Sequence, residues 1–179
     1  MKNAIIFSGS GGQGVMSMGM MLAQSAVESG RHAAYMPSYG PEQRGGSAKC
    51  TVIIDKDEII SPMAGKGGVL VAMNNMAYNK FINELEPGGI LLYDSTLVTM
   101  PIERKDVTAI GVPADAMALE VGSPKVANVI VIGALIALTG IVSAEEFQRS
   151  LDKKFAKKSD TVRALNAEAL RRGMAAAQK

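Results

Sequence analysis

Short apolar runs separated by glycine, proline and polar residues mark the first two thirds of the chain. Continuous runs of this kind are typical of strands covered on both faces of a sheet, whereas apolar residues that recur every three or four positions predict helices. The strands predicted in this way span residues 4–7, 31–36, 47–54, 68–73, 90–93 and 107–112. The pattern predicts helices between these strands at residues 15–29 and 76–85, and a further helix after the last strand at residues 114–121.

The last third of the chain carries helical patterns only, at residues 126–139, 143–155 and 160–177. Ser143 precedes Glu145 and Glu146, the order expected where a helix begins. Residues 126–142 contain no charge, but this run is shorter than the ~20 residues that a membrane-spanning helix needs. We therefore expect a buried core helix there and a soluble protein without membrane contact.

The segment that follows residues 47–54 indicates whether the strands of the expected sheet run parallel or antiparallel. A polar turn at residues 55–58 separates that strand from the apolar pair Ile59 and Ile60, which predicts a hairpin. A hairpin leaves no room for the crossover helix that parallel strands require. We therefore predict an α/β fold in three layers: a mixed, mostly parallel sheet with flanking helices, a Rossmann-like beginning and a helical C-terminal part. The length of 179 residues suits a single domain, residues 1–179.

A glycine-rich segment lies between the first predicted strand and the first predicted helix, and it reads Ser8-Gly9-Ser10-Gly11-Gly12-Gln13-Gly14. Strand, glycine turn and helix is the order that presents backbone N–H groups to an anionic ligand. A dinucleotide site also needs an acidic residue at the end of the second strand, and the residues there are Met36, Pro37 and Ser38. A stand-alone nucleotide-binding oxidoreductase is therefore an alternative that the sequence disfavours.

A second glycine-rich segment follows the second predicted strand and reads Tyr39-Gly40-Pro41-Glu42-Gln43-Arg44-Gly45-Gly46. An arginine among glycines can bind a phosphate or carboxylate through two N–H groups while the backbone approaches closely. The simpler interpretation is an exposed loop charge. Because both glycine segments follow strands, we expect them to converge at the carboxyl edge of the sheet, where ligands of open α/β sheets bind.

Composition limits the chemistry that this chain can perform alone. Cys50 is the single cysteine, which excludes an internal disulfide and a site of four cysteines for zinc or iron–sulfur. His32 is the single histidine and lies early in a strand, where we predict a structural role. The net charge of +2 does not indicate a nucleic-acid surface.

The N-terminus lacks the apolar region of a signal peptide, so we predict a cytoplasmic protein. The helix at residues 15–29 has almost no polar face, and we expect a partner to cover part of it.

Three segments together resemble the gamma subunit of 2-oxoacid:ferredoxin oxidoreductases. They are the first glycine segment, the second glycine segment, and Ala127-Asn128 at the beginning of an apolar helix. The resemblance covers nearly the whole chain. It is strongest to the gamma subunit of the 2-oxoglutarate enzyme, with pyruvate and branched-chain versions similar.

The resemblance implies a subunit that is inactive alone, within an enzyme that converts a 2-oxoacid and coenzyme A (CoA) into acyl-CoA and carbon dioxide. Thiamine diphosphate is expected between the alpha and beta subunits, and iron–sulfur clusters in beta or in a ferredoxin-like delta subunit, a further candidate partner. Ferredoxin or flavodoxin is the expected acceptor. No cofactor, catalytic residue or metal ligand is assigned to this chain alone.

The motifs of the resemblance define the candidate cofactor-binding residues on the CoA side of the active site. These are Gly9, Gly11, Gly12, Gln13, Gly14, Tyr39, Gly40, Pro41, Glu42, Arg44, Gly45, Gly46 and Asn128. The alternative is a purely structural subunit, in which the same loops brace a subunit interface without touching a ligand.

Overall fold

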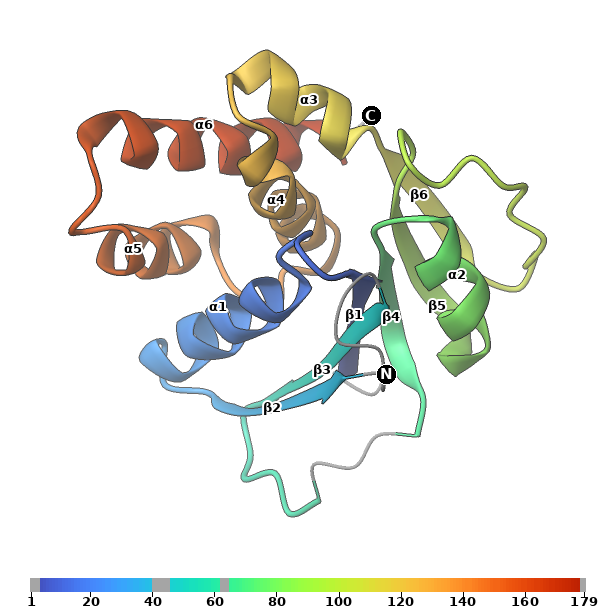
Figure 1. Ribbon diagram of the computed structural model, residues 1–179. Helices are drawn as coiled ribbons and strands as arrows, with labels where there is room; N and C mark the ends of the chain where they lie inside the picture. Colours follow the sequence, from blue (N-terminus) through green and yellow to red (C-terminus); the bar gives the residue numbers. More distant parts are fainter. Residues whose placement is uncertain (1–3, 40–45, 62–64, 178–179) are drawn as a thin grey trace.

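A six-stranded sheet in the order β2-β3-β1-β4-β5-β6 forms the middle of the molecule (Figure 1). The computed structural model describes residues 4–39, 46–61 and 65–177. Within these ranges the strands are β1 (Ala4–Ser10), β2 (His32–Tyr39), β3 (Ser47–Asp55), β4 (Gly67–Ala72), β5 (Leu85–Asp94) and β6 (Thr108–Val112). Most strands begin and end within a few residues of the predicted positions, because the apolar runs that predict them are the buried parts of the sheet.

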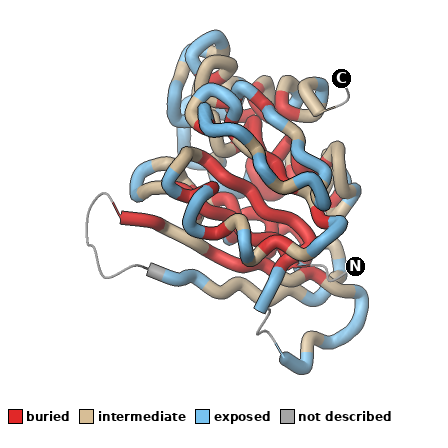
Figure 2. Tube along the Cα trace, turned by 90° about the vertical axis from the view of Figure 1, so that its right-hand side faces the viewer, coloured by how far each residue is buried: buried red, intermediate tan, exposed pale blue. Residues whose placement is uncertain are grey.

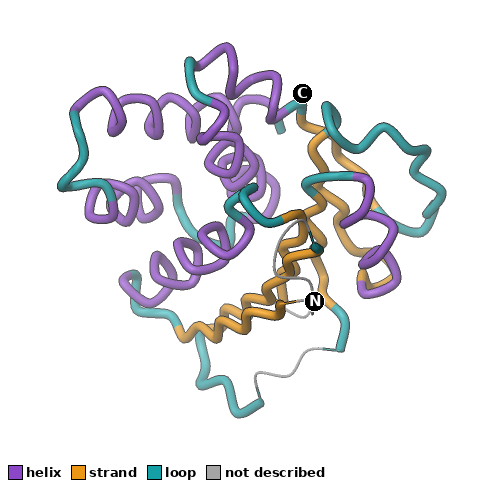
Figure 3. Tube along the Cα trace, viewed as in Figure 1, coloured by secondary structure: helices purple, strands orange, loops and turns teal. Residues whose placement is uncertain are grey.

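Helices cover both faces of the sheet, as the three-layer prediction requires. They are α1 (Val15–Glu28), α2 (Asn75–Phe81), the 3-10 turn η1 (Ile82–Glu84), α3 (Ala114–Val121), the 3-10 turn η2 (Pro124–Val126), α4 (Ala127–Thr139), α5 (Ala144–Lys154) and α6 (Asp160–Ala176). Of the α-helices in the described ranges, α2 alone lies on one face, while the others gather on the opposite face (Figure 3). The sheet between them is largely buried (Figure 2).

The sheet is mixed and mostly parallel, as predicted, but not because of the expected hairpin. β3 runs antiparallel to both β1 and β2, whereas β1, β4, β5 and β6 pair in parallel. The prediction of a strand at residues 59–60 was wrong. Asp55 accepts hydrogen bonds from the N–H groups of Lys56 and Asp57, which turns the chain away from the sheet, and Ile60 is 95% exposed.

The Rossmann-like beginning is confirmed with one strand inserted. β1, α1 and β2 follow in order, and because β3 is antiparallel to both strands, β1 and β2 run in the same direction. β3 separates the two strands, so β2 lies at the sheet edge rather than beside β1. The end of β2 is consequently not adjacent to the glycine segment in the way that a dinucleotide-binding unit requires.

The helix predicted at residues 76–85 is shorter than expected. It ends at Phe81, and the 3-10 turn η1 leads into β5, which starts at Leu85 opposite Gly67. By contrast, α5 begins as predicted. Ser143 Oγ accepts a hydrogen bond from Glu146 N–H, and the Glu146 carboxylate accepts one from Ser143 N–H. These reciprocal bonds satisfy backbone groups that are otherwise unpaired at a helix end.

The apolar helix α4 is the centre of the larger core. Its residues from Val129 to Ile136 are all buried, so the prediction of a core helix is confirmed. α4 crosses α6 at two glycines: a Cβ on Gly133 would lie 2.4 Å from the Leu170 carbonyl oxygen. A Cβ on Gly173 would lie 1.9 Å from the Ile130 carbonyl oxygen, so the two backbones are in contact. No helix in the described part of the chain is both long and apolar enough to cross a membrane.

The first helix is buried mainly within this chain. α1 contacts β1, β2, β3, α4 and α5, which explains why almost all of its positions are apolar. Met20 and Val27 remain 52% and 56% exposed. The expected partner over this helix therefore remains a prediction, and it concerns only this narrower surface.

Candidate functional site

The first glycine segment, residues 8–14, connects β1 to α1 at the carboxyl edge of the parallel strands (Figure 1). We call it the glycine loop. Gly12 and Gly14 have φ angles of 96° and 76°, a left-handed conformation that other residues rarely adopt. Gly9 is buried, and a Cβ there would lie 2.8 Å from both the Gln13 amide oxygen and a Val15 methyl group. The turn therefore needs glycine for its own geometry at these positions.

Gln13 fastens the glycine loop to the end of the neighbouring strand β4. Its Oε1 accepts hydrogen bonds from Ser10 N–H at 2.8 Å and from Asn74 Nδ2 at 2.7 Å. Its Nε2 donates to the Met73 carbonyl oxygen at 3.1 Å. Asn74 also donates to Ser10 Oγ and accepts from Ala77 N–H, which caps α2. A residue that the sequence indicated as a ligand contact thus has a bracing role inside the chain.

Asn128 approaches the glycine loop from the first turn of α4. A Cβ on Gly14 would lie 2.6 Å from Asn128 Nδ2, so the two residues are in contact. The Asn128 Oδ1 atom is buried and accepts no hydrogen bond from any residue in the described ranges. A buried acceptor left without a donor costs about 1–3 kcal/mol. The described residues of the chain therefore supply no donor for this atom.

A cavity of about 230 Å³ lies between the glycine loop and α4. We call it the glycine-loop cavity. Its lining comes from the loop, from the ends of β4 and β5, and from the beginnings of α3, η2 and α4: Gly12, Gln13, Gly14, Met73, Asp94, Leu97, Asp115, Pro124, Lys125, Ala127 and Asn128. Among the described residues no side chain caps the N-terminus of α1, whereas α4 continues directly from η2, whose N-cap Ser123 accepts a hydrogen bond from Lys125 N–H. The partial positive charge at the N-terminus of α1 is consequently available at this edge.

Asp94 is the buried carboxyl group of the cavity. One oxygen accepts a hydrogen bond from Thr96 N–H and the other from Asp115 N–H, both at 3.0 Å. Asp94 therefore caps the turn that follows its strand. Burial raises the pKa of Asp94 above its ordinary value, and the hydrogen bonds from Thr96 and Asp115 oppose this shift. Asp94 is thus a structural acceptor that ties β5 to α3 at the cavity wall.

The structure brings part of the predicted site together. Gly12, Gln13, Gly14 and Asn128 line one cavity, whereas Gly9 is buried and Gly11 is exposed, and neither of these two lines it. From the second glycine segment, the structure describes Tyr39 at the end of β2 and the buried Gly46 before β3. The candidates Gly40, Pro41, Glu42, Arg44 and Gly45 lie outside the described residues.

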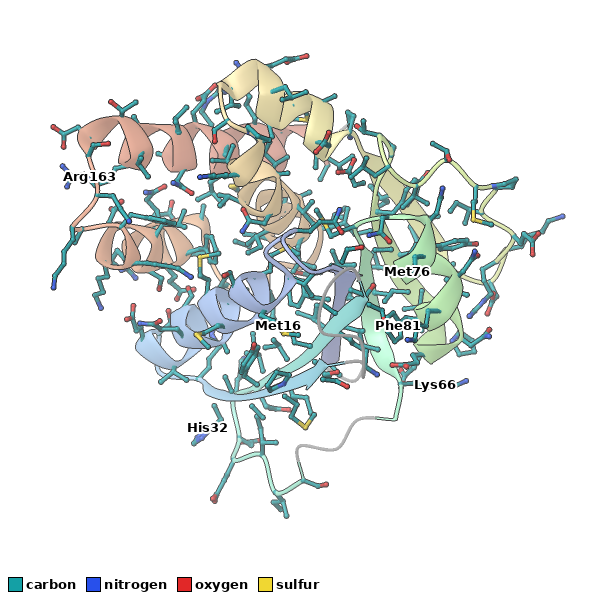
Figure 4. All side chains as sticks on the ribbon, viewed as in Figure 1. Met16, His32, Lys66, Met76, Phe81 and Arg163 are labelled. Atoms are coloured by element: carbon teal, nitrogen blue, oxygen red, sulfur yellow. The ribbon has the colours of Figure 1, made fainter. Side chains whose placement is uncertain are left out.

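The ends of the second glycine segment nevertheless lie at the expected edge. Ser47 is paired with Ser10, so β3 begins beside the end of β1, and Tyr39 is paired with Ala48, so β2 ends at the same edge of the sheet but one strand further out. The expected convergence of the two segments is therefore supported at their described ends. His32, in contrast, lies exposed at the amino end of β2, away from the glycine loop (Figure 4).

Two charged residues of the cavity, Asp115 and Lys125, were not among the predicted site residues. Both lie where a helix or 3-10 turn begins, at the positions that close the carboxyl edge of the sheet. Each follows a proline by one or two residues, a signal for helix starts that was available in the sequence. Which of these starts meet at one cavity depends on tertiary packing.

The comparisons with known proteins agree with this geometry. A family model described as pyruvate ferredoxin/flavodoxin oxidoreductase matches residues 4–176. The ketoisovalerate oxidoreductase subunit VorA of Methanothermobacter thermautotrophicus is 41% identical over 157 residues, which cover 87% of this chain and 32% of that relative. The chain therefore spans about a third of that relative's length. The 2-oxoglutarate synthase subunit KorC of Methanocaldococcus jannaschii is 37% identical over 154 residues, which cover 84% of this chain and 82% of the relative.

Two solved structures are similar over almost the whole chain. The gamma subunit of a keto/oxoacid ferredoxin oxidoreductase from Geobacter sulfurreducens PCA has a TM-score of 0.85 at 34% identity and is covered over 99% of both chains. The 2-oxoglutarate:ferredoxin oxidoreductase from Magnetococcus marinus, solved with 2-oxoglutarate, coenzyme A and succinyl-CoA bound, has a TM-score of 0.92 at 29% identity. The match covers 99% of this chain and 31% of the chain of that enzyme. The chain therefore belongs to the pyruvate ferredoxin/flavodoxin oxidoreductase family and is of the gamma-subunit type.

Proposed function

We propose that this chain is the gamma subunit of an enzyme that converts a 2-oxoacid and CoA into acyl-CoA and carbon dioxide, with reduction of ferredoxin. We favour 2-oxoglutarate as the 2-oxoacid. The similarity to the KorC subunit and to the 2-oxoglutarate enzyme of Magnetococcus marinus supports this choice, while the VorA relative supports a branched-chain substrate. We also propose that residues 1–179 form one domain that binds alpha and beta subunits.

In this proposal the chain contributes the glycine-loop cavity to the CoA side of the active site. The observation that carries it is the buried, unpartnered Asn128 Oδ1 beside the glycine loop. CoA has amide N–H and hydroxyl groups that can donate to such an atom. The N-terminus of α1, which no described side chain caps, adds N–H groups that favour an anionic ligand. The role of the chain would be to bind and orient CoA.

The redox chemistry belongs to other chains in this proposal. Thiamine diphosphate and iron–sulfur clusters in the partner subunits would supply decarboxylation and electron transfer. Cys50 does not fit a cluster: it is the single cysteine, it is buried, and burial raises the pKa of its thiol to about 12. Its Sγ contacts the Val15 carbonyl oxygen within the core. No step of the reaction is therefore assigned to this thiol.

The test is reconstitution of the enzyme with and without this chain. Alpha and beta subunits co-expressed with it should reduce a viologen dye when supplied with both 2-oxoglutarate and CoA. The same complex lacking this chain should be inactive or have a much higher KM for CoA. Pyruvate and 2-oxoisovalerate serve as competing substrates. Equal activity without this chain, or turnover by this chain alone, would contradict the proposal.

A second candidate function is a structural subunit without ligand contact. The observation in its favour is the engagement of Gln13, whose amide group braces the glycine loop from within. Native mass spectrometry of the reconstituted enzyme separates the two functions. A purely structural role predicts that an Asn128 variant is lost from the complex, with an unchanged KM for CoA in the enzyme that remains. A ligand-binding role predicts an intact complex with a raised KM.

A further inference from the structure

A second cavity lies beside the glycine-loop cavity, at the beginning of α6. It has a volume of about 280 Å³ and is enclosed by η2, the end of α5 and the first turns of α6. We call it the α6 cavity. The walls are mostly apolar, and the lining residues are Ser123, Lys125, Val126, Phe155, Lys158, Val162, Leu165 and Asn166.

The polar groups of the α6 cavity are few and largely unengaged. Asn166 is 6% exposed, and its Nδ2 donates to the Val162 carbonyl oxygen at 2.8 Å. Lys125 and Lys158 form no ion pair with any residue that the structure describes. The cavity thus combines a buried amide with two cations that have no partner.

The two cavities share a wall. Lys125 lines both the glycine-loop cavity and the α6 cavity, because η2 lies between them. A ligand with an anionic group at Lys125 can therefore place one part in each cavity. A compact ligand such as free phosphate would need only one of them. The arrangement favours an extended molecule with phosphate near its middle.

The chemistry of each part identifies the class of ligand. An aromatic ring and aliphatic side chains, here Phe155, Val162 and Leu165, suit a flat heterocycle. The Asn166 amide oxygen suits an exocyclic amino group at the edge of that ring, and lysines suit phosphates. An adenine base with flanking phosphates has all of these groups.

We propose that the α6 cavity binds the phosphorylated adenosine end of CoA, while the pantetheine arm enters the glycine-loop cavity. This inference rests on the proposed function, because it takes CoA as the substrate. It goes beyond that function in naming a second cavity, with Lys158 and Lys125 on the phosphates and Phe155 beside the base. Asn166 accepts a hydrogen bond from the base.

The first test compares two neighbouring lysines in the reconstituted enzyme. Lys158→Glu reverses a charge at the cavity, and Lys157→Glu makes the same change at an exposed residue that does not line it. We expect Lys158→Glu to raise the KM for CoA about tenfold or more, the loss expected for a charge-assisted contact, with an unchanged KM for 2-oxoglutarate. Lys157→Glu should leave both constants near the wild-type values. Equal effects of the two variants on the KM for CoA would overturn the inference while leaving the proposed function intact.

The second test uses the full chain alone and does not depend on activity. The sequence contains no tryptophan, so Phe155→Trp introduces a single fluorescent reporter at the cavity. Titration with adenosine 3′,5′-bisphosphate should change its emission, and Lys158→Glu in the same background should weaken this response about tenfold or more. Phe81→Trp, on α2 across the sheet, is the matched control and should not respond.

The two tests also separate the inference from the function on which it rests. A nucleotide response at residue 155 in a chain whose complex does not require CoA would mean that the cavity is a nucleotide site and that the proposed function is wrong. A CoA-dependent complex with no response at residue 155, and with no difference between the two lysine variants, would mean that the inference is wrong.

Discussion

At the scale of single residues, Asn128 and Gln13 line the same cavity but differ in their hydrogen bonding. Gln13 has partners for both atoms of its amide within the chain, whereas the Asn128 oxygen has none in the described ranges. The wall of this cavity therefore holds one amide group that braces the fold and one amide oxygen that no described residue of the chain satisfies. Their substitutions should separate stability from function.

We expect Gln13→Ala to lower the free energy of unfolding by about 1–3 kcal/mol, because it leaves hydrogen-bonding groups of Ser10, Met73 and Asn74 unpaired. Asn128→Ala should change the free energy of unfolding by less than about 1 kcal/mol, since it removes an acceptor that is already unsatisfied. Urea denaturation of the two variants measures this. A larger loss of stability in Asn128→Ala than in Gln13→Ala would contradict the assignment.

Asp94 provides a prediction about pH. Because burial raises the pKa of its carboxyl above the ordinary value of 3.8, the folded chain binds a proton more tightly than the unfolded chain. The stabilisation from this group is therefore fully present below pH 3.8 and is lost as the pH rises through the raised pKa. Asp94→Asn cannot titrate at this position.

The wild-type free energy of unfolding, minus that of Asp94→Asn, should accordingly decrease as the pH is raised from about 4 to 6. Carboxylates whose pKa is lowered, such as Glu28 and Glu146, contribute the opposite slope, but they are present in both proteins and cancel. Chemical denaturation at a series of pH values measures the difference. A difference that rises with pH would show that the hydrogen bonds from Thr96 and Asp115 outweigh burial.

At the scale of elements, the crossing of α4 and α6 depends on glycine. Gly173→Ala would bring a Cβ to 1.9 Å from the Ile130 carbonyl oxygen, and a backbone atom cannot move aside as a flexible side chain can. We expect a loss of stability of about 1–3 kcal/mol, the usual cost of overpacking a core. Gly65→Ala, where a Cβ would meet nothing within 4 Å, is the control. Thermal unfolding that is equal for both variants would contradict the close contact.

Elements whose limits are set locally were predictable from the sequence. α3 was predicted at its observed limits, and α5 begins after Ser143 as expected, because caps and prolines act within a few residues. Elements that depend on distant pairing were not. Ile59 and Ile60 follow a polar turn, as a hairpin strand would, but β3 already has β1 and β2 on its two sides. The vacant edge that a further strand would need does not exist there.

The glycine-loop cavity shows the same difference between features that are set locally and features that depend on distant packing. Of the four predicted site residues that line it, Gly12, Gln13 and Gly14 belong to a glycine turn between strand and helix, which has a local signature, whereas Asn128 was assigned through the family resemblance. Asp115 and Lys125 joined them only through the packing of α3 and η2 over the sheet edge. Asp115 and Lys125 are about 100 residues away from the glycine loop in the sequence, and nothing in the sequence indicates that they line the same cavity.

At the scale of the whole molecule, the exposed part of α1 is the expected contact with a partner. Met20 and Val27 lie seven positions apart on this helix and are 52% and 56% exposed. We expect the double substitution Met20→Glu and Val27→Glu to leave the isolated chain folded and to reduce its incorporation into the complex. Leu119→Glu, at a 61% exposed residue of α3, is the control. Native mass spectrometry that finds equal incorporation of both variants would remove this helix from the interface.

The reversed direction of β3 has a consequence for how this edge of the molecule can vary. Because β3 runs against β2, the chain leaves the sheet at Tyr39 and re-enters it before Ser47 on the neighbouring strand, about 5 Å away. The same pairing joins Ser47 to Ser10, so both entry points are fixed relative to the glycine loop. The segment between these two points can be replaced without disturbing the sheet. The reason is that the register of β2 and β3 is set by their own strand pairing. We expect an exchange of this segment between relatives with different 2-oxoacids to leave the strands and the glycine loop in place, and we propose that it changes which ligand this edge binds.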